Sequence, residues 1–223
     1  MKTTIISLGG SIIFPNKIDI KFLKDFKRLI ESFVKKGRRF VIICGGGSVA
    51  RKYQQAISKI IGNDTESLDW MGISITHVNA FLMGILLQDY SDENIIINPK
   101  KNITSKKRVL VAGGWKPGCS TDYDAVLLAK NLKAGTVINI TNVDYVYDKN
   151  PKLKGAKKIK ETTWKEIRKI VGNKWSPGLN MPFDPIAAKL SEKLKLKVIV
   201  TGKNLNNLKR VLENKKFKGT LIR

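Results

Sequence analysis

Near its start the chain reads Thr3-Thr4-Ile5-Ile6-Ser7-Leu8-Gly9-Gly10-Ser11, a short apolar run that ends in a pair of glycines. A run of this length bounded by glycine is typical of a buried β-strand followed by a tight turn. Residues 20–34 then carry apolar side chains at helical spacing and are closed by Gly37, which predicts an amphipathic helix. The first unit of the chain is therefore a strand, a glycine turn and a helix.

The same unit recurs along the chain. Residues 40–44 form the next apolar run, three glycines follow, and a helical pattern continues to about residue 61. Further strands are expected at residues 94–97, 109–111, 137–140 and 198–200, and further helices at residues 68–87, 123–132, 164–171, 185–194 and 205–212. Residues 149–160 have the composition of a loop, and we expect a mobile flap there. Apolar strands alternating with amphipathic helices predict an α/β fold whose mostly parallel sheet is covered on both faces.

The length and the composition of the chain favour a folded protein with a hydrophobic core. Its 223 residues, 42% of them hydrophobic, fit one substantial domain or two closely joined lobes. No apolar run approaches the roughly 20 residues of a membrane span, so no membrane partner is expected. Cys44 and Cys119 are the only cysteines, too few for a disulfide framework or a metal cluster, which favours a cytoplasmic location.

The chain is strongly basic, with 42 Lys and Arg against 18 Asp and Glu and a formal net charge of +24. A basic surface can bind the phosphate backbone of nucleic acids. The lysines are nevertheless spread over the whole chain, without a concentrated patch, interleaved aromatics or a known reader motif. We therefore attribute the charge to compositional bias and expect no nucleic-acid partner.

Glycine turns follow several predicted strands, and in open α/β sheets ligands bind beyond the carboxyl ends of the strands. These turns are Gly9-Gly10-Ser11, Gly45-Gly46-Gly47-Ser48 and Gly113-Gly114-Trp115-Lys116-Pro117-Gly118. Backbone N–H groups in such turns can approach anionic oxygens closely, which favours phosphate. The chain contains neither a P-loop nor a Gly-x-Gly-x-x-Gly motif after the first strand, which disfavours P-loop kinases and Rossmann dehydrogenases.

Several collinear motifs resemble those of the amino acid kinase superfamily, and within it the archaeal-type UMP kinases. They are Ile6–Ser11, Cys44–Gly47 with Ala50–Tyr53, Asp69-x-x-Gly72-x-x-x-Thr76, Gly113–Asp122, Thr141–Asp144 with Tyr147 and Pro151, and Asp184-Pro185-x-Ala187-Ala188-Lys189. The resemblance covers essentially the whole chain. It implies a single amino acid kinase domain with a three-layer αβα fold, usually in a hexamer. It also implies transfer of the ATP γ-phosphoryl group to UMP, giving ADP and UDP.

The resemblance also implies which residues act. The acceptor-binding half would span about residues 1–121 and the ATP-binding half about residues 122–223. The residues expected to bind ATP are Gly10, Ser11, Gly47, Arg51, Thr141, Asn142, Tyr147 and Asn150. Those expected to bind UMP are Gly46, Asp69, Trp115, Lys116, Pro117, Gly118, Cys119, Ser120 and Thr121. Mg²⁺ is expected to accompany ATP, without a dedicated set of metal ligands from the protein.

Three residues are candidates for the catalytic set. Phosphoryl transfer needs positioning and charge stabilisation more than covalent help. Arg51, one turn into its helix, could aim a guanidinium at the transferred group, or it could be an exposed helix cation. Asp122 and Asp184 each precede or open a helix, so each could cap that helix or orient Mg²⁺ or a catalytic cation.

Two further side chains admit alternative roles. Asp69 could accept hydrogen bonds from ribose hydroxyls or act as the N-cap of a helix that starts at Trp70. His77 lies inside a helix and is expected to be a partly buried, hydrogen-bonded residue or a subunit contact, because an ionised phosphate acceptor needs no general base.

The chain departs from the family pattern at Leu8, Tyr145 and Asn150, where relatives often carry Lys, Gly and Asp. These departures leave open a catalytically silent nucleotide-binding relative. Another kinase of the same fold, for isopentenyl phosphate or acetylglutamate, is a further alternative, but those relatives usually carry His where this chain has Cys44.

Overall fold

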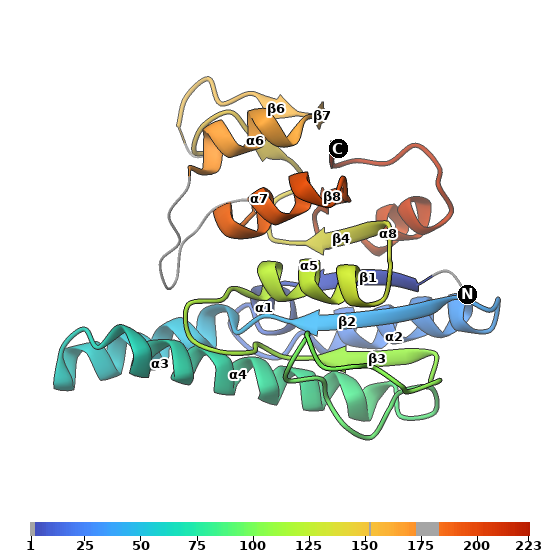
Figure 1. Cartoon of the computed structure of the whole chain (residues 1–223), viewed down its shortest axis with the longest axis horizontal. Coiled ribbons are helices and arrows are strands. Elements are labelled where there is room, and N and C mark those ends of the chain that lie inside the picture. The colour runs from blue at the N-terminus through green and yellow to red at the C-terminus, as the bar shows by residue number, and fades with distance from the viewer. Residues whose placement is uncertain (1–2, 152, 173–182) are drawn as a thin grey trace.

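The computed structural model describes residues 3–151, 153–172 and 183–223. Its centre is a seven-stranded sheet in the order β3-β2-β1-β4-β8-β9-β7 (Figure 1). The strands are β1 (Thr3–Leu8), β2 (Arg39–Cys44), β3 (Val109–Ala112), β4 (Thr136–Ile140), β7 (Glu161–Thr162), β8 (Lys197–Thr201) and β9 (Thr220–Ile222). All neighbouring strands are parallel except β8 and β9, which confirms the predicted mostly parallel sheet.

Helices cover both faces of this sheet, so the fold has the three-layer αβα arrangement that the resemblance implied. The core on one face includes α1 (Gly10–Ile13), α2 (Ile20–Val34), α4 (Thr65–Leu86) and α8 (Leu205–Leu212). The core on the other face includes α5 (Thr121–Asn131), α6 (Trp164–Val171) and α7 (Pro185–Lys193). The remaining long helix, α3 (Gly47–Ile61), packs against α4 and buries only Ala50.

The central strands are apolar on both sides, as the sequence predicted. Along β2, Phe40 and Ile42 pack into one core, whereas Val41 and Ile43 pack into the other, since successive side chains of a strand point to opposite faces. A strand buried on both faces needs a continuous apolar run. Runs of this kind are what made the central strands visible in the sequence.

The prediction of a strand at residues 94–97 was wrong. Only Ile96 makes a bridge there, to Ala112 of β3, and Ser91 makes a second isolated bridge to Val109. The Asp92 carboxylate accepts a hydrogen bond from the Asn94 backbone N–H (3.1 Å), and this local turn competes with a regular ladder.

Several short elements were not predicted, because they are too short for a periodic pattern to identify. They include α1, β7 and β9. A small hairpin is also formed by β5 (Val146–Tyr147) and β6 (Lys158–Ile159), so the end of the expected loop at residues 149–160 contributes a strand.

Candidate active site

The strand register brings the predicted glycine turns to one edge of the sheet. Leu8 at the end of β1 lies opposite Cys44 of β2 and Ile140 of β4. In the same way Ile43 lies opposite Ala112 of β3, and Ile140 lies opposite Thr201 of β8. The turns that begin at residues 9, 45, 113, 141 and 202 therefore lie together at the carboxyl ends of the strands. We call this end of the sheet the carboxyl edge, and ligands of such sheets bind there.

Two of these turns touch each other. A Cβ atom added to Gly10 would lie 2.3 Å from the carbonyl oxygen of Gly45 and 2.4 Å from the nitrogen of Gly47. Gly47 itself has φ +66°, a conformation that glycine adopts without strain. No other residue type fits this contact, so the chain uses glycine to bring two backbone turns together at the edge.

Helix α4 fixes the loop that follows β3. The Asp69 carboxylate accepts a hydrogen bond from Gly118 N–H (2.8 Å), and the Thr76 hydroxyl accepts one from Gly114 N–H (2.7 Å). His77 Nε2 donates to the Gly114 carbonyl oxygen (2.8 Å), which confirms the expected hydrogen-bonded helix residue. The predicted acceptor loop therefore lies against α4, together with Asp69.

The N-cap alternative for Asp69 was wrong. The helix begins four residues earlier than Asp69, and its cap is Asp64, whose carboxylate accepts a hydrogen bond from Glu66 N–H (3.3 Å). Asp69 is buried within the helix, and burial raises its pKa while the Gly118 N–H opposes that change. A second bond from the same helix, from Asn79 Nδ2 to the Gly45 carbonyl oxygen (2.8 Å), anchors the turn after β2.

Three carboxyl groups follow the predicted acceptor loop, two of them in α5 and one at the N-cap of α7. Asp122 accepts a hydrogen bond from the Ser7 hydroxyl (3.1 Å), Asp124 accepts one from Trp115 N–H (3.0 Å), and Asp184 accepts one from Ala187 N–H (2.5 Å). One oxygen of Asp124 and one of Asp184 are buried without a hydrogen-bond partner. Asp122 and Asp184 were predicted from the sequence but Asp124 was not, because its role depends on a hydrogen bond from the Trp115 backbone, nine residues earlier in the chain.

Burial and crowding raise the pKa of these acids. Burial, with a smaller contribution from the negative charge of Asp184, raises the pKa of Asp122 to about 7. Burial likewise raises the pKa of Asp124 to about 7, although the Trp115 N–H opposes the change. The pKa of Asp184 is also raised by burial, with hydrogen bonds from Ala187 and Ser120 opposing it. A cation at this place would be favoured, because several buried like charges destabilise one another.

Of the two predicted acids, one caps a helix and the other does not. Asp184 is the N-cap of α7, as one of its two alternatives stated. Asp122 is not a cap, because Ser120 occupies that place and accepts a hydrogen bond from Tyr123 N–H (3.1 Å). Ser120, expected to bind UMP, therefore has a structural role at the start of α5, and Thr121 is the first residue of that helix.

The rest of the acceptor loop is half-buried or exposed. Two ammonium groups lie near the Trp115 ring, from Lys116 at 4.6 Å and from Lys100 at 4.9 Å. Sequence reasoning missed Lys100, which precedes β3 and belongs to no motif. Burial raises the pKa of the Cys119 thiol to about 11, so this residue is a neutral thiol near neutral pH. Pro117 stands in the turn that ends at Gly118 (φ +77°).

The residues predicted to bind ATP lie less close to one another than those predicted to bind UMP. Thr141 follows β4, and its backbone N–H donates to Thr201 O (2.9 Å), whereas Asn142 and Arg51 are exposed. Tyr147 lies in β5 and Asn150 in the hairpin beyond it. β5 and β6 pair as a separate two-stranded sheet, whereas the glycine turns follow strands of the seven-stranded sheet. The structure therefore brings the acceptor residues together and leaves part of the donor set apart.

The residues that depart from the family pattern have definite places. Leu8 is fully buried in the core, so its side chain does not reach the edge. The Lys158 ammonium group lies 5.4 Å from the ring centroid of Tyr145, across the β5–β6 hairpin.

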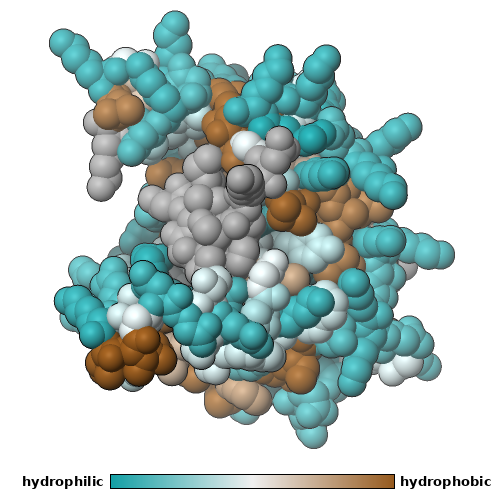
Figure 2. Space-filling model, turned by 60° about the vertical axis from the view of Figure 1, so that its left-hand side comes forward, coloured by the Kyte–Doolittle hydropathy of each residue, from teal (hydrophilic) through white to brown (hydrophobic). Residues whose placement is uncertain are grey.

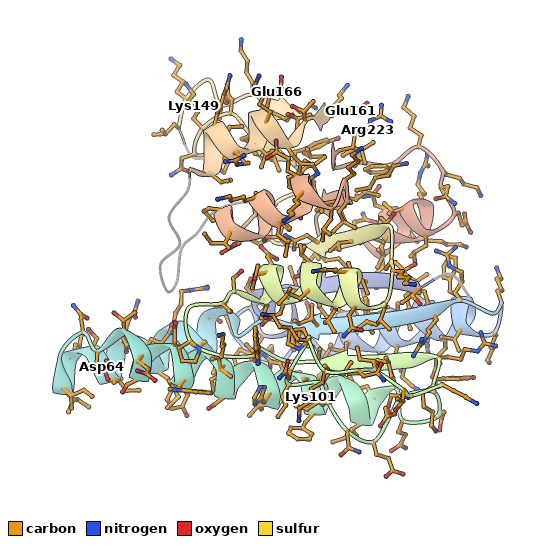
Figure 3. All side chains as sticks on the ribbon, viewed as in Figure 1. Asp64, Lys101, Lys149, Glu161, Glu166 and Arg223 are labelled. Carbon is orange, nitrogen blue, oxygen red and sulfur yellow. The ribbon has the colours of Figure 1, made fainter. Side chains whose placement is uncertain are left out.

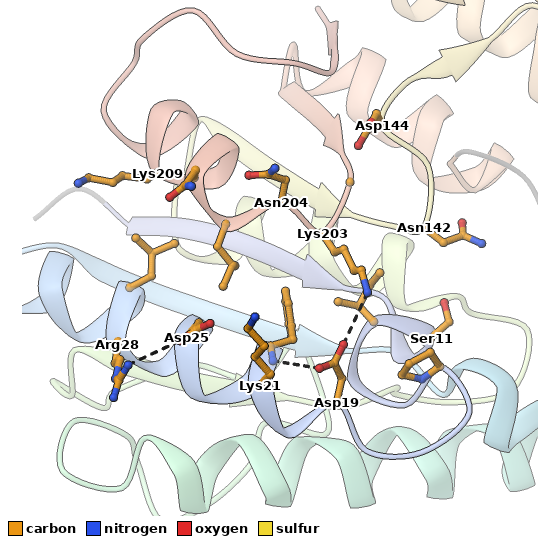
Figure 4. A pocket seen from close by; sticks show the side chains of 17 residues that line it. Ser11, Asp19, Lys21, Asp25, Arg28, Asn142, Asp144, Lys203, Asn204 and Lys209 are labelled. Atoms are coloured by element: carbon orange, nitrogen blue, oxygen red, sulfur yellow. Dashed lines mark hydrogen bonds and ion pairs between the residues drawn. The ribbon is translucent and has the colours of Figure 1, made fainter.

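A cavity of about 880 Å³ opens beside this edge, between α1, α2 and α8 (Figure 4). Ser11 and Asn142, both expected to bind ATP, line it, and so does Lys203, which the sequence analysis did not select. The Lys203 ammonium group lies 3.6 Å from the Asp19 carboxylate. This pair places a cation next to the turn after β1.

The site fits a metal ion that a nucleotide brings with it. In the part of the chain that the structure describes, no three His, Cys, Asp or Glu side chains are grouped so that they could hold a metal. The unpartnered buried oxygens of Asp124 and Asp184 can supply one or two ligands. Mg²⁺ is typically held in this way, by one or two carboxylates together with substrate phosphates.

The sequence matches the amino acid kinase family over residues 2–202, so the chain belongs to the amino acid kinase family. It is 36% identical over 219 residues to the uridylate kinase of Thermoplasma volcanium, covering 96% of this chain and 94% of that protein. It is 33% identical to the uridylate kinase of Thermoplasma acidophilum, covering 99% of this chain and 96% of the relative.

A solved structure supports the same assignment. The uridylate kinase of Archaeoglobus fulgidus superimposes with a TM-score of 0.84 and 31% identity, over 100% of both chains. Within the amino acid kinase family the chain is thus a relative of the archaeal uridylate kinases. No helix in the described ranges has the length and apolar character needed to cross a membrane.

Proposed function

We propose that this chain transfers the γ-phosphoryl group of ATP to UMP, giving ADP and UDP, as part of pyrimidine nucleotide biosynthesis. The observation that carries the proposal is the contact between the Gly10 and Gly47 turns, next to an acceptor loop that α4 holds in place. Two backbone turns in contact can hold donor and acceptor phosphates side by side, and such positioning is the main requirement of phosphoryl transfer.

Each element of the site has a role in this reaction. Asp69 would accept hydrogen bonds from the acceptor ribose, and Gly46 with the loop of residues 115–121 would enclose UMP. The turn at Gly10-Ser11, Gly47, Thr141 and Asn142 would hold the ATP phosphates, with Tyr147 and Asn150 toward the nucleoside. Arg51, exposed at the first turns of α3, would move its guanidinium onto the transferred group.

Mg²⁺ is the metal that we propose for this site, with the unpartnered oxygens of Asp184 and Asp124 as the groups that would hold it. When bound with ATP, the ion neutralises phosphate charge and so eases the transfer. Asp122 orients the edge through its bond to Ser7. Because Leu8 carries no charge, we propose that Arg51 and Lys203 supply the positive charge at the donor side.

We also propose a division of labour within one domain, with UMP bound by residues 1–121 and ATP by residues 122–223. The sheet is continuous across this division, because β1 of the first half pairs with β4 of the second. The division therefore concerns ligands rather than separate folding units.

A homo-oligomer, a hexamer by the family pattern, is part of the proposal. Helix α4 leaves large apolar side chains exposed: Trp70 (47%), Phe81 (53%), Val78 (62%) and Ile85 (66%). Figure 2 shows apolar side chains at the lower end of the molecule, where α3 and α4 lie. A second copy would cover such a stripe. Light scattering should give a mass above the 25.0 kDa of one chain.

We propose a cytoplasmic enzyme that acts on small molecules and not on nucleic acid. Basic side chains extend from the whole outline of the molecule, from Lys149 on the upper hairpin to Lys101 near the lower edge (Figure 3). Charge spread over the whole surface is less typical of nucleic-acid binding than a single basic patch with interleaved aromatic side chains.

The deciding experiment measures ADP release with ATP and Mg²⁺ while UMP, CMP, dUMP, isopentenyl phosphate and acetylglutamate are offered separately. Rapid turnover with UMP supports the proposal. Turnover with isopentenyl phosphate or acetylglutamate alone would assign a different kinase of the same fold. ATP binding without turnover on any acceptor would indicate a nucleotide-binding protein.

A further inference from the structure

A second cavity lies at the amino-terminal ends of the central strands, whereas the proposed active site lies at their carboxyl ends. Its volume is about 400 Å³, and it is lined by the first residues of three central strands, Thr3 and Thr4 of β1, Thr136 of β4 and Lys197 of β8. The C-terminal end of α8 and Phe217 close its other side. The volume is within the roughly 300–1,000 Å³ of small-molecule sites.

Positive charge dominates the lining of this cavity. Arg38, Lys133, Lys197 and Lys215 all line it, and none of the described lining residues is acidic. Lys215 forms an ion pair with Glu213 (2.8 Å). No ion pair is found for Arg38, Lys133 or Lys197 within the described part of the chain. Three cations therefore face one cavity without a protein carboxylate to balance them.

Arg38 gives the cavity a fixed charge, in contrast to the exposed lysines. Its guanidinium donates to the Thr4 hydroxyl (3.2 Å) and to the Leu212 carbonyl oxygen (3.4 Å). Its Nε atom is buried and has no hydrogen-bond partner. A partly buried guanidinium with an unsatisfied donor and no carboxylate is costly to the folded chain, because neither water nor a counterion compensates it fully. A bound anion would reduce that cost.

The remaining wall of the cavity is apolar. Leu132, Ile199 and Phe217 contribute to it, between the sheet and the end of α8. A ligand that fits must present negative charge to the cations and a flat or compact apolar part to these side chains. Inorganic anions supply only the first of these two features.

We propose that this cavity binds a small phosphate monoester with an apolar organic part, at a site separate from the active site. The separation is roughly 13–17 Å, because the central strands that begin at the cavity have five or six residues and rise about 3.3 Å per residue before they reach the catalytic edge. The proposal does not depend on the identity of the acceptor, since no residue assigned to UMP or ATP lines this cavity.

The test uses the full chain with the active site saturated by UMP and a non-hydrolysable ATP analogue. Phenyl phosphate is then titrated by calorimetry, with inorganic phosphate and phenol as probes of charge alone and ring alone. We expect one equivalent of phenyl phosphate to bind, and both control compounds to bind at least about tenfold more weakly, because each lacks one of the two features. Hydrogen exchange should slow at residues 3–4, 133–136 and 211–217.

The matched variants are the double substitutions Lys133→Glu with Lys197→Glu at the cavity, and Lys24→Glu with Lys59→Glu as a control. All four lysines are exposed, and both pairs change the net charge equally. We expect the cavity pair to weaken binding at least about tenfold and the control pair to leave it nearly unchanged. If the cavity pair fails to fold, Arg38→Gln is compared with Lys24→Gln, which changes the net charge by the same amount.

Three results would overturn the proposal. They are no binding of phenyl phosphate beyond the active site, binding by both double variants as tight as that of the unmodified chain, and a loss of binding to the same extent in both. UMP turnover is measured on separate portions of the same preparations, with ATP in place of the analogue. Absence of turnover in the unmodified chain would refute the proposed function but would leave this binding result intact.

Discussion

Hydrogen bonds from α4 hold the predicted acceptor loop at Gly114 and Gly118, 37 to 49 residues away in the sequence, whereas residues 148–157, between β5 and β6, form hydrogen bonds with one another. In that hairpin Lys157 N–H donates to Asp148 (2.8 Å), and Leu153 N–H donates to Asn150 O (2.9 Å). The two sides of one active-site edge are thus ordered by different kinds of contact.

This difference has a physical consequence for binding. Contacts between distant segments fix the predicted acceptor loop as part of the folded core, so under the proposed function little ordering would remain when UMP binds. Local contacts allow residues 148–157 to adjust, and under the proposed function ATP would order them at a cost in conformational entropy. We expect substitutions on the acceptor side to have larger effects than those in the hairpin.

The largest effect is expected for Gly10→Ala. Its Cβ would lie 2.3 Å from Gly45 O, so the two turns must separate, and misplacement by about 1 Å can cost about 100-fold in rate. We expect kcat/KM for UMP to fall by at least that factor while circular dichroism stays unchanged. Gly84→Ala is the control, since nothing lies within 4 Å of its added Cβ, and it should keep full activity.

A smaller loss is expected for Asp69→Ala, which removes the acceptor for Gly118 N–H. Hydrogen bonds to charged groups contribute about 1.5–3 kcal/mol, so KM for UMP should rise about tenfold or more, with a smaller change in kcat. Asp69→Asn keeps an oxygen for Gly118 and should lie between Ala and the unmodified chain. A KM for UMP that the Ala variant leaves unaltered would contradict the proposed tether.

The pH dependence of stability should report on Asp124. Its pKa is raised by burial to about 7, above the value of about 3.8 in the unfolded chain, so the folded state binds the extra proton. The contribution of this group is therefore greatest at acid pH and is lost as pH rises from about 4 to about 7. Asp124→Asn should make the free energy of unfolding less dependent on pH in that window, and Asp64→Asn should not. Equal slopes for Asp124→Asn and the unmodified chain, measured in urea, would show that Asp124 is ionised when folded.

The smallest effect is expected for Asp148→Ala in the hairpin. Asp148 is exposed, and its bond to Lys157 N–H is local. We expect the free energy of unfolding to change by no more than about 0.5 kcal/mol and KM for ATP by less than about twofold. A change in KM as large as that of Asp69→Ala would mean that the two sides are equally preorganised.

The sequence predicted the parts of this fold that carry a strong periodic signal. Central strands such as β2 are continuous apolar runs, and helices such as α2 have a regular apolar face, so both were found nearly to their ends. The hairpin strands β5 and β6 have two residues each, and no periodicity exists at that length. The strand at residues 94–97 failed because a local turn at Asp92 outweighed its apolar residues.

The site was predicted where glycine turns and motifs follow strands, and missed where it depends on tertiary contacts. Asp69 was selected, but its bond to Gly118 could not be known without the position of α4. Asp124, Lys100 and Lys203 belong to no recognisable spacing, and only the folded chain brings them to the edge. The sequence pattern identifies the glycine turns for which we propose phosphate binding, whereas packing determines which residues surround them.

The segment before β3 has a consequence for solubility. β3 is the outer strand of the sheet, and an open outer strand can pair with the same strand of another molecule and start aggregation. Here Val109 N–H donates to Tyr90 O (3.1 Å), Asp92 N–H donates to Val109 O (3.2 Å), and Ile96 N–H donates to Val111 O (2.8 Å). An irregular segment thus occupies the pairing groups of β3 without becoming a new outer strand, and it protects the protein from edge-to-edge aggregation at high concentration.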